Sequence, residues 1–367
     1  MLYINESIER KFVVDLFTKV GVSEEHANLA ADVVIQSDAT GVSTHGLARM
    51  PMYINRIQLG AVNPTPNIRL VNDSPSLMVL DGDNGPGNVV GPTALNMVIE
   101  AAKKYGMAAI AIRNSNHYGV GNFYGQRFAE AGLIGITMSS STPNVAPTGG
   151  RVPMLGTNPM TMGVPAGEHF PIVLDMATSV VAFGKIQKAA DQGEKIPFGW
   201  AVDKEGKPTD DPKAALDNGS LLPIGGYKGY GLALMIDVMS ALLSQAAYGL
   251  EIGDKFDNTC TDPEKIGHFM MAMDVSKFYD LDKFKENVDK YIDTMKNTEK
   301  ALGVEEIFMP GEIEFKRAVI IAETGIPVAP VLGAQMVKLA KKVGIEVETA
   351  EELFARYSDE NLAPSEA

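Results

Sequence analysis

The strongest candidate for proton transfer is a histidine in a polar segment that follows an apolar run. Residues 114–125 read NSNHYGVGNFYG, and the preceding MAAIAI predicts a buried strand. Ligands of α/β folds lie at the ends of such strands. Histidine titrates near neutral pH, so His117 is suited to take a hydroxyl proton while a hydride leaves the same carbon. A structural cap at the strand end is the alternative.

A second group of chemically active side chains occupies residues 43–53, which read STHGLARMPMY. If this segment is helical, a spacing of four residues places His45, Arg49 and Tyr53 on one face. That face would combine a proton-transfer group, a cation with paired donors and a phenol. The same spacing also fits a solvated helix face with a structural histidine, and this alternative stays open.

Two glycine-rich segments bear on nucleotide binding. Gly119, Gly121 and Gly125 resemble a loosened dinucleotide fingerprint, but the acidic residue expected at the next strand end is replaced by SSSTPN. We therefore reject an ordinary Rossmann domain. Residues 225–231 (GGYKGYG) lack the Walker pattern, yet their backbone N–H groups and Lys228 suit phosphate contact. A purely structural glycine turn is the alternative.

Composition excludes several classes of protein. An apolar share of 45% and a charged share of 21% are typical of a folded globular chain. The net charge of −14 argues against a nucleic-acid partner, because such partners are held by cations. The 5 histidines form no HxH or HExxH pair, and no GxSxG motif occurs. We therefore expect neither a metal site nor a serine nucleophile.

Compartment is indicated by the cysteine count and by the apolar runs. Cys260 is the single cysteine, which excludes an internal disulfide and fits the reducing cytoplasm. Residues 1–12 carry no apolar signal segment, and no apolar run reaches the roughly 18 residues of a membrane span. We expect a cytoplasmic protein that does not insert into a membrane.

The elements that must position these residues follow from local patterns. Ser23 is predicted to cap a helix in a mostly helical N-terminal part, followed by a hairpin or two short strands in residues 63–83 and a helix in 90–105. From residue 106 onward we expect βα units, formed by the segments MAAIAIRN, FYGQRFAEAGL and IGITMSSS. A further strand, ending in Asp175, is expected at IVLDMATS. Residues 191–223 are expected to form an exposed excursion before a long apolar helix. Residues 275–302 predict an amphipathic surface helix, and 332–343 and a capping box at Thr349 predict two more helices.

Taken together, these motifs resemble the malate/L-lactate dehydrogenase family, NAD(P)-dependent oxidoreductases that lack a Rossmann fold. The likeness covers nearly the whole chain and follows the family's order. It rests on the segments GVSTHGLARMPMY, NSNHYGVGNFYGQ, SSSTPNVAPTGGR, LGTNPMTMGVP, LDMATS, FGKI, LPIGGYKGYGLAL and FMPGE.

The resemblance implies an α/β fold of two parts. A non-Rossmann NAD(P)-binding domain on a mixed, largely antiparallel sheet would take residues 106–314. A mostly helical substrate and dimerisation domain would be formed by the two chain ends, residues 1–105 and 315–367. The active site would be completed at a homodimer interface.

The resemblance also assigns roles to residues. His117 matches the general acid/base, and Arg49 would hold the substrate carboxylate through two parallel hydrogen bonds. The substrate side would comprise Ser43, His45, Arg49 and Tyr53. The dinucleotide would be held by Ser141, Thr157, Asp175, Met176, Ala177, Lys228 and the turn formed by Pro310, Gly311 and Glu312.

The implied reaction is hydride transfer between NAD(H) and a small 2-hydroxy acid/2-oxo acid pair, with malate and oxaloacetate as the first choice. Phe183 stands where some members that use NADP carry a basic residue, which favours NAD and leaves NADP as the alternative. Relatives with similar motifs act on L-lactate, L-sulfolactate, ureidoglycolate or cyclic imino acids. A dinucleotide-binding protein without turnover is the non-enzyme alternative, against which intact His117 and Arg49 argue.

Overall fold

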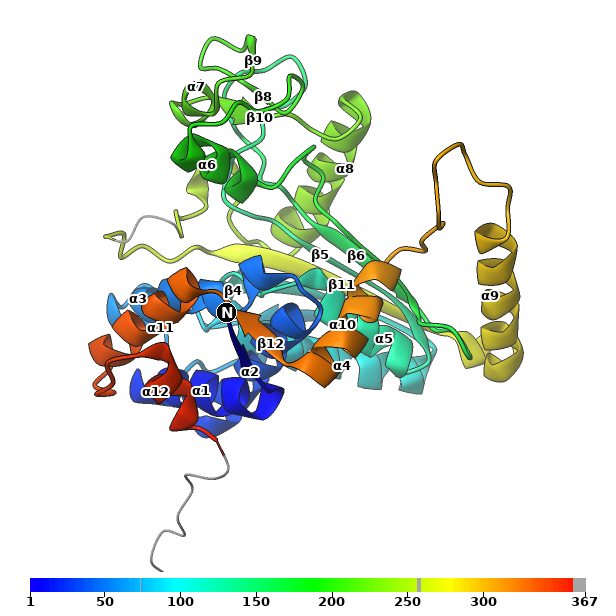
Figure 1. Cartoon of the computed structure of the whole chain (residues 1–367). Coiled ribbons are helices and arrows are strands. Elements are labelled where there is room, and N and C mark those ends of the chain that lie inside the picture. The colour runs from blue at the N-terminus through cyan, green and yellow to red at the C-terminus, as the bar shows by residue number, and fades with distance from the viewer. Residues whose placement is uncertain (73, 256–258, 359–367) are drawn as a thin grey trace, which may run out of the picture.

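A seven-stranded mixed sheet runs through the middle of the molecule (Figure 1). The computed structural model describes residues 1–72, 74–255 and 259–358. In sheet order the strands are β2 (Arg69–Leu70), β3 (Leu77–Asp81), β4 (Met107–Ser115), β11 (Ile266–Asp274), β5 (Leu133–Ser139), β6 (Met160–Val164) and β7 (Ile172–Met176). Among these described strands only β3 and β4 pair in parallel. The predicted mixed, largely antiparallel sheet is confirmed.

The strands β4 and β5 are not neighbours, so the simple βα units predicted from residue 106 onward are wrong in their pairing. β11 comes from much later in the chain, lies between the two and pairs antiparallel with both. Nearly all of its side chains are buried, as expected for a strand with both faces covered. The elements themselves are confirmed, because α5 (Gly121–Glu130) connects β4 to β5.

Helices cover both faces of the sheet. α4 (Gly87–Tyr105) and α5 pack on one face, and α2 (Glu24–Ala39) lies over them. The opposite face carries η3 (Val238–Leu242), the π-helical continuation of α8 (Tyr227–Asp237). η3 lies directly on the strand backbone, because a Cβ on Gly267 of β11 would come within 2.0 Å of the Ser240 carbonyl oxygen. The long apolar helix predicted here is confirmed, with a π-helical second half.

The two chain ends meet in one helical layer. β1 (Leu2–Ile4) pairs antiparallel with β12 (Ile326–Val328), which ties the N-terminal segment to the C-terminal one. The layer contains α1 (Glu6–Lys19), α2, α3 (Met50–Gln58), α10 (Glu312–Thr324), α11 (Pro330–Lys342) and α12 (Ala350–Ala355). Buried side chains from both ends, such as Phe12, Phe17, Met336 and Phe354, share one core. The exact division into domains at residues 105 and 315 stays a prediction.

Local capping explains where several helices begin. The Ser23 side chain accepts the His26 backbone N–H at the start of α2, and Thr349 accepts the Glu352 backbone N–H at the start of α12. Both predicted caps are confirmed. α9 (Leu281–Lys296) is the predicted surface helix, and Ile292 is its one buried side chain. Within the described residues, no helix combines the length and the apolar character that crossing a membrane requires.

Residues 191–223 project from the body with mostly exposed or half-buried side chains, as predicted, but they are folded rather than irregular. They form most of a small lobe, at the top of Figure 1, with a three-stranded sheet of β8 (Ala201–Val202), β9 (Pro208–Thr209) and β10 (Ser220–Leu221). α6 (Phe183–Gln192) and α7 (Pro212–Leu216) pack against each other beside it. A separate core of Ile186, Ile196, Ala201, Leu221 and Ala233 holds the lobe together. The apolar residues of this core are widely spaced among charged residues, so local sequence patterns do not reveal it.

Candidate active site

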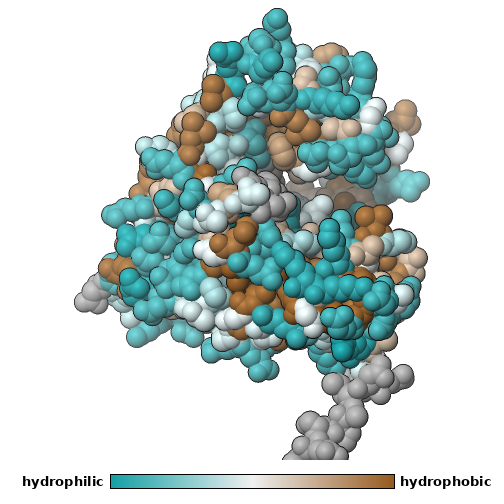
Figure 2. All heavy atoms as spheres, turned by 90° about the vertical axis from the view of Figure 1, so that its left-hand side faces the viewer, coloured by the Kyte–Doolittle hydropathy of each residue, from teal (hydrophilic) through white to brown (hydrophobic). Residues whose placement is uncertain are grey.

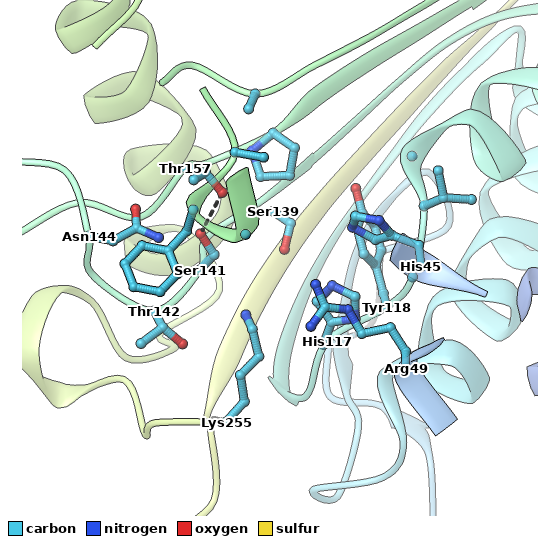
Figure 3. A pocket seen from close by; sticks show the side chains of 18 of the residues that line it. His45, Arg49, His117, Tyr118, Ser139, Ser141, Thr142, Asn144, Thr157 and Lys255 are labelled. Carbon is cyan, nitrogen blue, oxygen red and sulfur yellow. Dashed lines mark hydrogen bonds between the residues drawn. The ribbon is translucent and has the colours of Figure 1, made fainter. Parts of the chain in front are cut away.

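A cavity of about 650 Å³ lies between the helical layer, the sheet and the small lobe. That volume is within the range typical of sites for small molecules and cofactors. In Figure 2 the surface is hollowed between the lobe above and the body below. Figure 3 shows His45, Arg49, His117 and Tyr118 on one side of the cavity and Ser141, Thr142, Asn144 and Thr157 on the other.

His117 follows the end of β4 and lines this cavity. Its backbone is held against the start of α4, where a Cβ on Gly87 would lie 1.9 Å from the Asn116 carbonyl oxygen. The Asn116 side chain also donates to the Gly85 carbonyl at 2.8 Å. His117 Nδ1 lies 2.8 Å from the Tyr53 phenolic oxygen, which leaves Nε2 as the ring nitrogen for a substrate.

Burial keeps the active-site imidazoles neutral. Burial, together with electrostatic interactions with Lys255, His45 and Arg49, lowers the pKa of His117 well below its ordinary value. Burial and the charges of Arg49 and Lys255 lower the pKa of His45 to about 4. The His45 ring stacks on that of His117 with centroids 5.5 Å apart. Burial also raises the pKa of Tyr53, so its phenol keeps its proton.

The segment with His45, Arg49 and Tyr53 does not form one helix, contrary to the prediction. It consists of two 3-10 turns, η1 (Ser43–His45) and η2 (Leu47–Arg49), followed by α3. Asp38 of α2 separates the turns, since its carboxylate accepts the Leu47 N–H at 2.6 Å. A Cβ on Gly46 would lie 1.9 Å from the same carboxylate, so only glycine fits there. The turns still bring the three side chains together around His117.

The predicted substrate residues therefore fall into two groups. His45 and Arg49 line the cavity beside His117, and Tyr53 reaches His117 from the helical layer. Ser43 is exposed at the start of η1 and is outside the set of residues that line the cavity.

Five of the predicted cofactor residues line the cavity, namely Ser141, Thr157, Asp175, Met176 and Ala177. The Ser141 and Thr157 hydroxyl oxygens lie 3.4 Å apart (Figure 3). Asn158 fixes the Thr157 loop, because its side chain donates to Asp237 at 2.8 Å and to the Ala233 carbonyl at 3.0 Å.

Asp175 has structural partners as well as a place at the cavity wall. Its carboxylate accepts the Asn122 backbone N–H in the first turn of α5 and the Thr161 hydroxyl, both at 2.8 Å. A carboxylate at this position complements the positive end of the helix. Asp175 thus anchors the start of α5 directly after the loop that contains His117.

The other predicted cofactor residues lie outside this cavity. Lys228 is exposed in the first turn of α8. Pro310, Gly311 and Glu312 lie at the outer part of β7, where the Pro310 carbonyl accepts the Val173 N–H at 3.0 Å. The Glu312 carboxylate accepts hydrogen bonds from Lys296 and from the Met309 backbone. The structure does not bring these four together with Ser141 and Thr157.

A buried histidine that the sequence analysis missed supports the sheet below His117. His268 of β11 lies with Nδ1 2.8 Å from the Ser139 hydroxyl and Nε2 2.9 Å from the Ser115 hydroxyl. Its ring stacks on Tyr118 with centroids 4.5 Å apart. Burial lowers the pKa of His268 to about 3, so it is neutral. These bonds join β4, β11 and β5 at the end where the cavity begins.

Three charged residues near the cavity also escaped the sequence analysis. Lys255 lines the cavity, and Arg56 and Glu264 lie beside it in the interior. The segment around Lys255 reads GDKFDNTCTDPEK, a composition typical of a solvated loop. Nothing local distinguishes a buried lysine there from an exposed one.

Comparison with known proteins is consistent across sequence and structure. The family model for malate/L-lactate dehydrogenase matches residues 4–337. The chain is 37% identical to the malate/(S)-sulfolactate dehydrogenase of Methanothermus fervidus, over 94% of this chain and 99% of that one. The malate dehydrogenase structure from Entamoeba histolytica has a TM-score of 0.88 at 34% identity, covering 94% of this chain and 99% of that chain. The sulfolactate dehydrogenase structure from Methanocaldococcus jannaschii has a TM-score of 0.87 at 38% identity, covering 94% and 98%. The chain belongs to the malate/L-lactate dehydrogenase family, and it is an NAD(P)-dependent dehydrogenase that acts on 2-hydroxy acids.

Proposed function

We propose that this protein interconverts malate and oxaloacetate with NAD(H), using His117 as the group that moves the hydroxyl proton. The observation that carries the proposal is the arrangement around His117. A neutral imidazole, bonded through Nδ1 to Tyr53, lies in the same cavity as the Arg49 cation. A 2-hydroxy acid needs these two groups, a base for its hydroxyl and a cation for its carboxylate.

His117 works in both directions through its hydrogen bond to Tyr53. When Nδ1–H donates to the Tyr53 oxygen, Nε2 has a lone pair and takes the hydroxyl proton of the 2-hydroxy acid. In the reverse direction, protonated His117 donates from Nε2 to the keto oxygen. A nicotinamide cofactor, when held in this cavity, would supply or accept the hydride. Arg49 orients the substrate through its carboxylate, and a bound substrate and dinucleotide would fill the cavity and limit access of water.

The opposite side of the cavity fits a dinucleotide. Ser141 and Thr157 offer hydroxyl groups, and Met176 and Ala177 offer a partly apolar wall. The start of α6 also lines the cavity at Phe183 and Gly184, where a Cβ on Gly184 would meet no atom within 4 Å. First-turn N–H groups of a helix bind anions such as a pyrophosphate. The contacts assigned to Lys228 and to residues 310–312 stay predictions.

Phe183 supports NAD as the preferred cofactor. It lines the cavity at the first residue of α6, in place of the basic residue that a 2′-phosphate would need there. Asp191 lines the cavity on the same helix and would repel that phosphate, whereas Lys188 would attract it. The ratio of kcat/KM for NADH over NADPH measures the balance directly, and we expect it to exceed 1.

A homodimer is part of the proposal. Four large apolar side chains are exposed along α8, η3 and the residue after η3, namely Leu232, Met235, Leu242 and Leu243, although such side chains are normally buried. Lys228 is exposed at the start of the same helix. A second copy on this face would cover the apolar side chains. Sedimentation equilibrium tests the proposal, with a dimer mass expected and a monomer mass contradicting it.

The experiment follows absorbance of the reduced nicotinamide with oxaloacetate, sulfopyruvate, pyruvate and glyoxylate-derived substrates, each with NADH and with NADPH. We expect turnover with oxaloacetate and NADH. Turnover restricted to another of these substrates would replace malate by the corresponding hydroxy acid. Cofactor binding without turnover on any of them would favour a dinucleotide-binding protein that does no chemistry.

A further inference from the structure

Lys255 is a second cation at the cavity, and the proposed reaction does not use it. Its side chain is 7% exposed and lines the same cavity as Arg49 and His117. In Figure 3 the Lys255 ammonium group points up into the space between the Ser141 side of the cavity and the His117 side. A lysine in a charged surface loop normally extends into water instead.

Two backbone carbonyls of this part of the chain, those of Asp254 and Asp262, are bonded to α3. Arg56 of α3 donates to the Asp254 carbonyl at 3.2 Å and to the Asp262 carbonyl at 2.7 Å. The Arg56 side chain is almost fully buried, and so is Glu264, whose Oε1 lies 3.6 Å from Arg56 Nε. The contact with Asp254 anchors the backbone directly before Lys255 to the helical layer, so Lys255 is positioned by α3.

Charged groups of both signs lie near this ammonium group in the part of the chain that the structure describes. Burial lowers the pKa of Lys255, Glu264 and Asp254 favour its protonated form, and Arg49 and Arg56 oppose it. Asp254 is exposed, so Glu264 is the buried carboxylate among these four.

Arg49 and Lys255 line one cavity, so a ligand with two negative charges can pair one of them with each cation. A monocarboxylate such as pyruvate would bring one negative charge, and a 2-oxo dicarboxylate would bring two. Lysine presents a compact point charge with rotatable donors, whereas arginine presents a planar fork. A point charge accepts a planar carboxylate and a tetrahedral sulfonate alike.

Resting on the proposed function, we infer that Lys255 is a specificity-determining residue that binds the second anionic group of the substrate. Arg49 takes the carboxylate next to the reacting carbon, and Lys255 takes the far group. The site thereby selects dianionic 2-oxo acids, either four-carbon dicarboxylates or their 3-sulfonate analogues, over monocarboxylates.

The test compares two dianions, oxaloacetate and sulfopyruvate, with two monoanions, pyruvate and 2-oxobutyrate. Lys255→Met keeps the length of the side chain and removes its charge. We expect kcat/KM to fall about 10²-fold for both dianions, mainly through KM, and to change less than about threefold for the monoanions. Lys255→Arg should keep the preference for dianions. Arg49→Lys should weaken binding of all four substrates, because every one of them has the carboxylate next to the reacting carbon.

Lys265→Met is the matched control, since Lys265 is exposed ten residues further on and is outside the set that lines the cavity. We expect it to match the wild type on all four substrates. An equal loss on monoanions and dianions in Lys255→Met, or no loss at all, would overturn the role of Lys255.

A second test uses the wild-type protein, so it does not require that any variant folds. Its kcat/KM for the better dianion should exceed that for pyruvate by at least about 10², and a ratio near 1 overturns the inference. A wild-type protein without turnover on any 2-oxo acid would instead contradict the proposed function.

Discussion

The Tyr53 phenol and the His117 imidazole join two parts of the chain that are 64 residues apart in sequence, with 2.8 Å between Oη and Nδ1. Tyr53 belongs to α3 in the helical layer, and His117 follows the sheet strand β4. The proton-transfer group is therefore oriented across the boundary between layer and sheet. An imidazole with one nitrogen fixed in this way presents the other in a defined direction.

Tyr53→Phe removes this hydrogen bond and preserves the ring. We expect kcat to fall about 10–10²-fold, because the His117 ring loses the partner that fixes its orientation and tautomer. Affinity for NADH should stay within about threefold. Steady-state kinetics and a fluorescence titration of NADH measure the two quantities. Tyr3→Phe is the control, since Tyr3 is exposed on β1; kinetics of Tyr53→Phe that match this control would refute the positioning role.

The pH dependence of malate oxidation reports on His117. Its pKa is lowered, chiefly by burial and then by Lys255, His45, Arg49 and His268, so the free enzyme holds a neutral base well into the acidic range. A base is active above its pKa, so kcat/KM should stay level through neutral pH, and its acidic decline should lie well below the ordinary pKa of histidine. A decline centred near the ordinary pKa of histidine would contradict this electrostatic account.

Lys255→Met should shift the pH at which kcat/KM declines on the acidic side. Lys255 is the largest of the charges that lower the pKa of His117, so its removal should move the acidic decline upward in pH. The change is read with lactate, a monoanion that does not depend on Lys255 for binding. A decline that stays in place or moves downward would show that burial alone sets the pKa.

The carboxyl group of Asp38 predicts an effect of pH on stability. Burial raises its pKa from 3.8 to about 6, next to the equally buried Glu9, whose pKa burial also raises. The folded state then keeps a proton that the unfolded chain releases, so this contribution to stability is present below about pH 4 and lost as the pH rises through 6. At about 1.4 kcal/mol per pKa unit, the loss is about 3 kcal/mol.

Asp38→Asn should remove much of that loss. The amide oxygen can still accept the Leu47 N–H, and the amide group is neutral beside Glu9. We expect the free energy of unfolding at pH 8 to rise by about 1–3 kcal/mol and its slope between pH 4 and 6 to flatten. Urea denaturation at several pH values measures both, with Asp282→Asn on the exposed face of α9 as the control. A variant less stable than wild type at pH 8 would contradict the assignment.

Local patterns predicted most helices and strands but not how they pair. The strand, helix and strand between residues 107 and 139 each have a complete local signal, such as the alternating burial of β5. The insertion of β11 between β4 and β5 depends on contacts more than 100 residues apart in sequence, as in the bond of Ser139 to His268 at a separation of 129. The largely antiparallel sheet was predicted from the family resemblance, and periodicity alone would have paired β4 with β5.

For the candidate site too, local patterns predicted some residues but not the long-range contacts that bring the site together. The spacing of His45, Arg49 and Tyr53 predicted that they come together, although two short turns and a helix achieve this instead of one helix face. Lys255 and Glu264 had no local signal, because a charged loop looks the same whether or not its lysine is buried. Their burial depends on Arg56, which is 206 residues away from Asp262 in the sequence.

The measurement closest to the central claim is the effect of His117→Ala on oxaloacetate reduction at saturating NADH, with His26→Ala on the helical layer as the control. If His117 moves the proton, kcat should fall by about 10²–10⁴-fold while the dissociation constant of NADH, titrated separately, stays within about threefold. A loss of less than about tenfold, or a loss fully explained by weaker NADH binding, would contradict the role of His117.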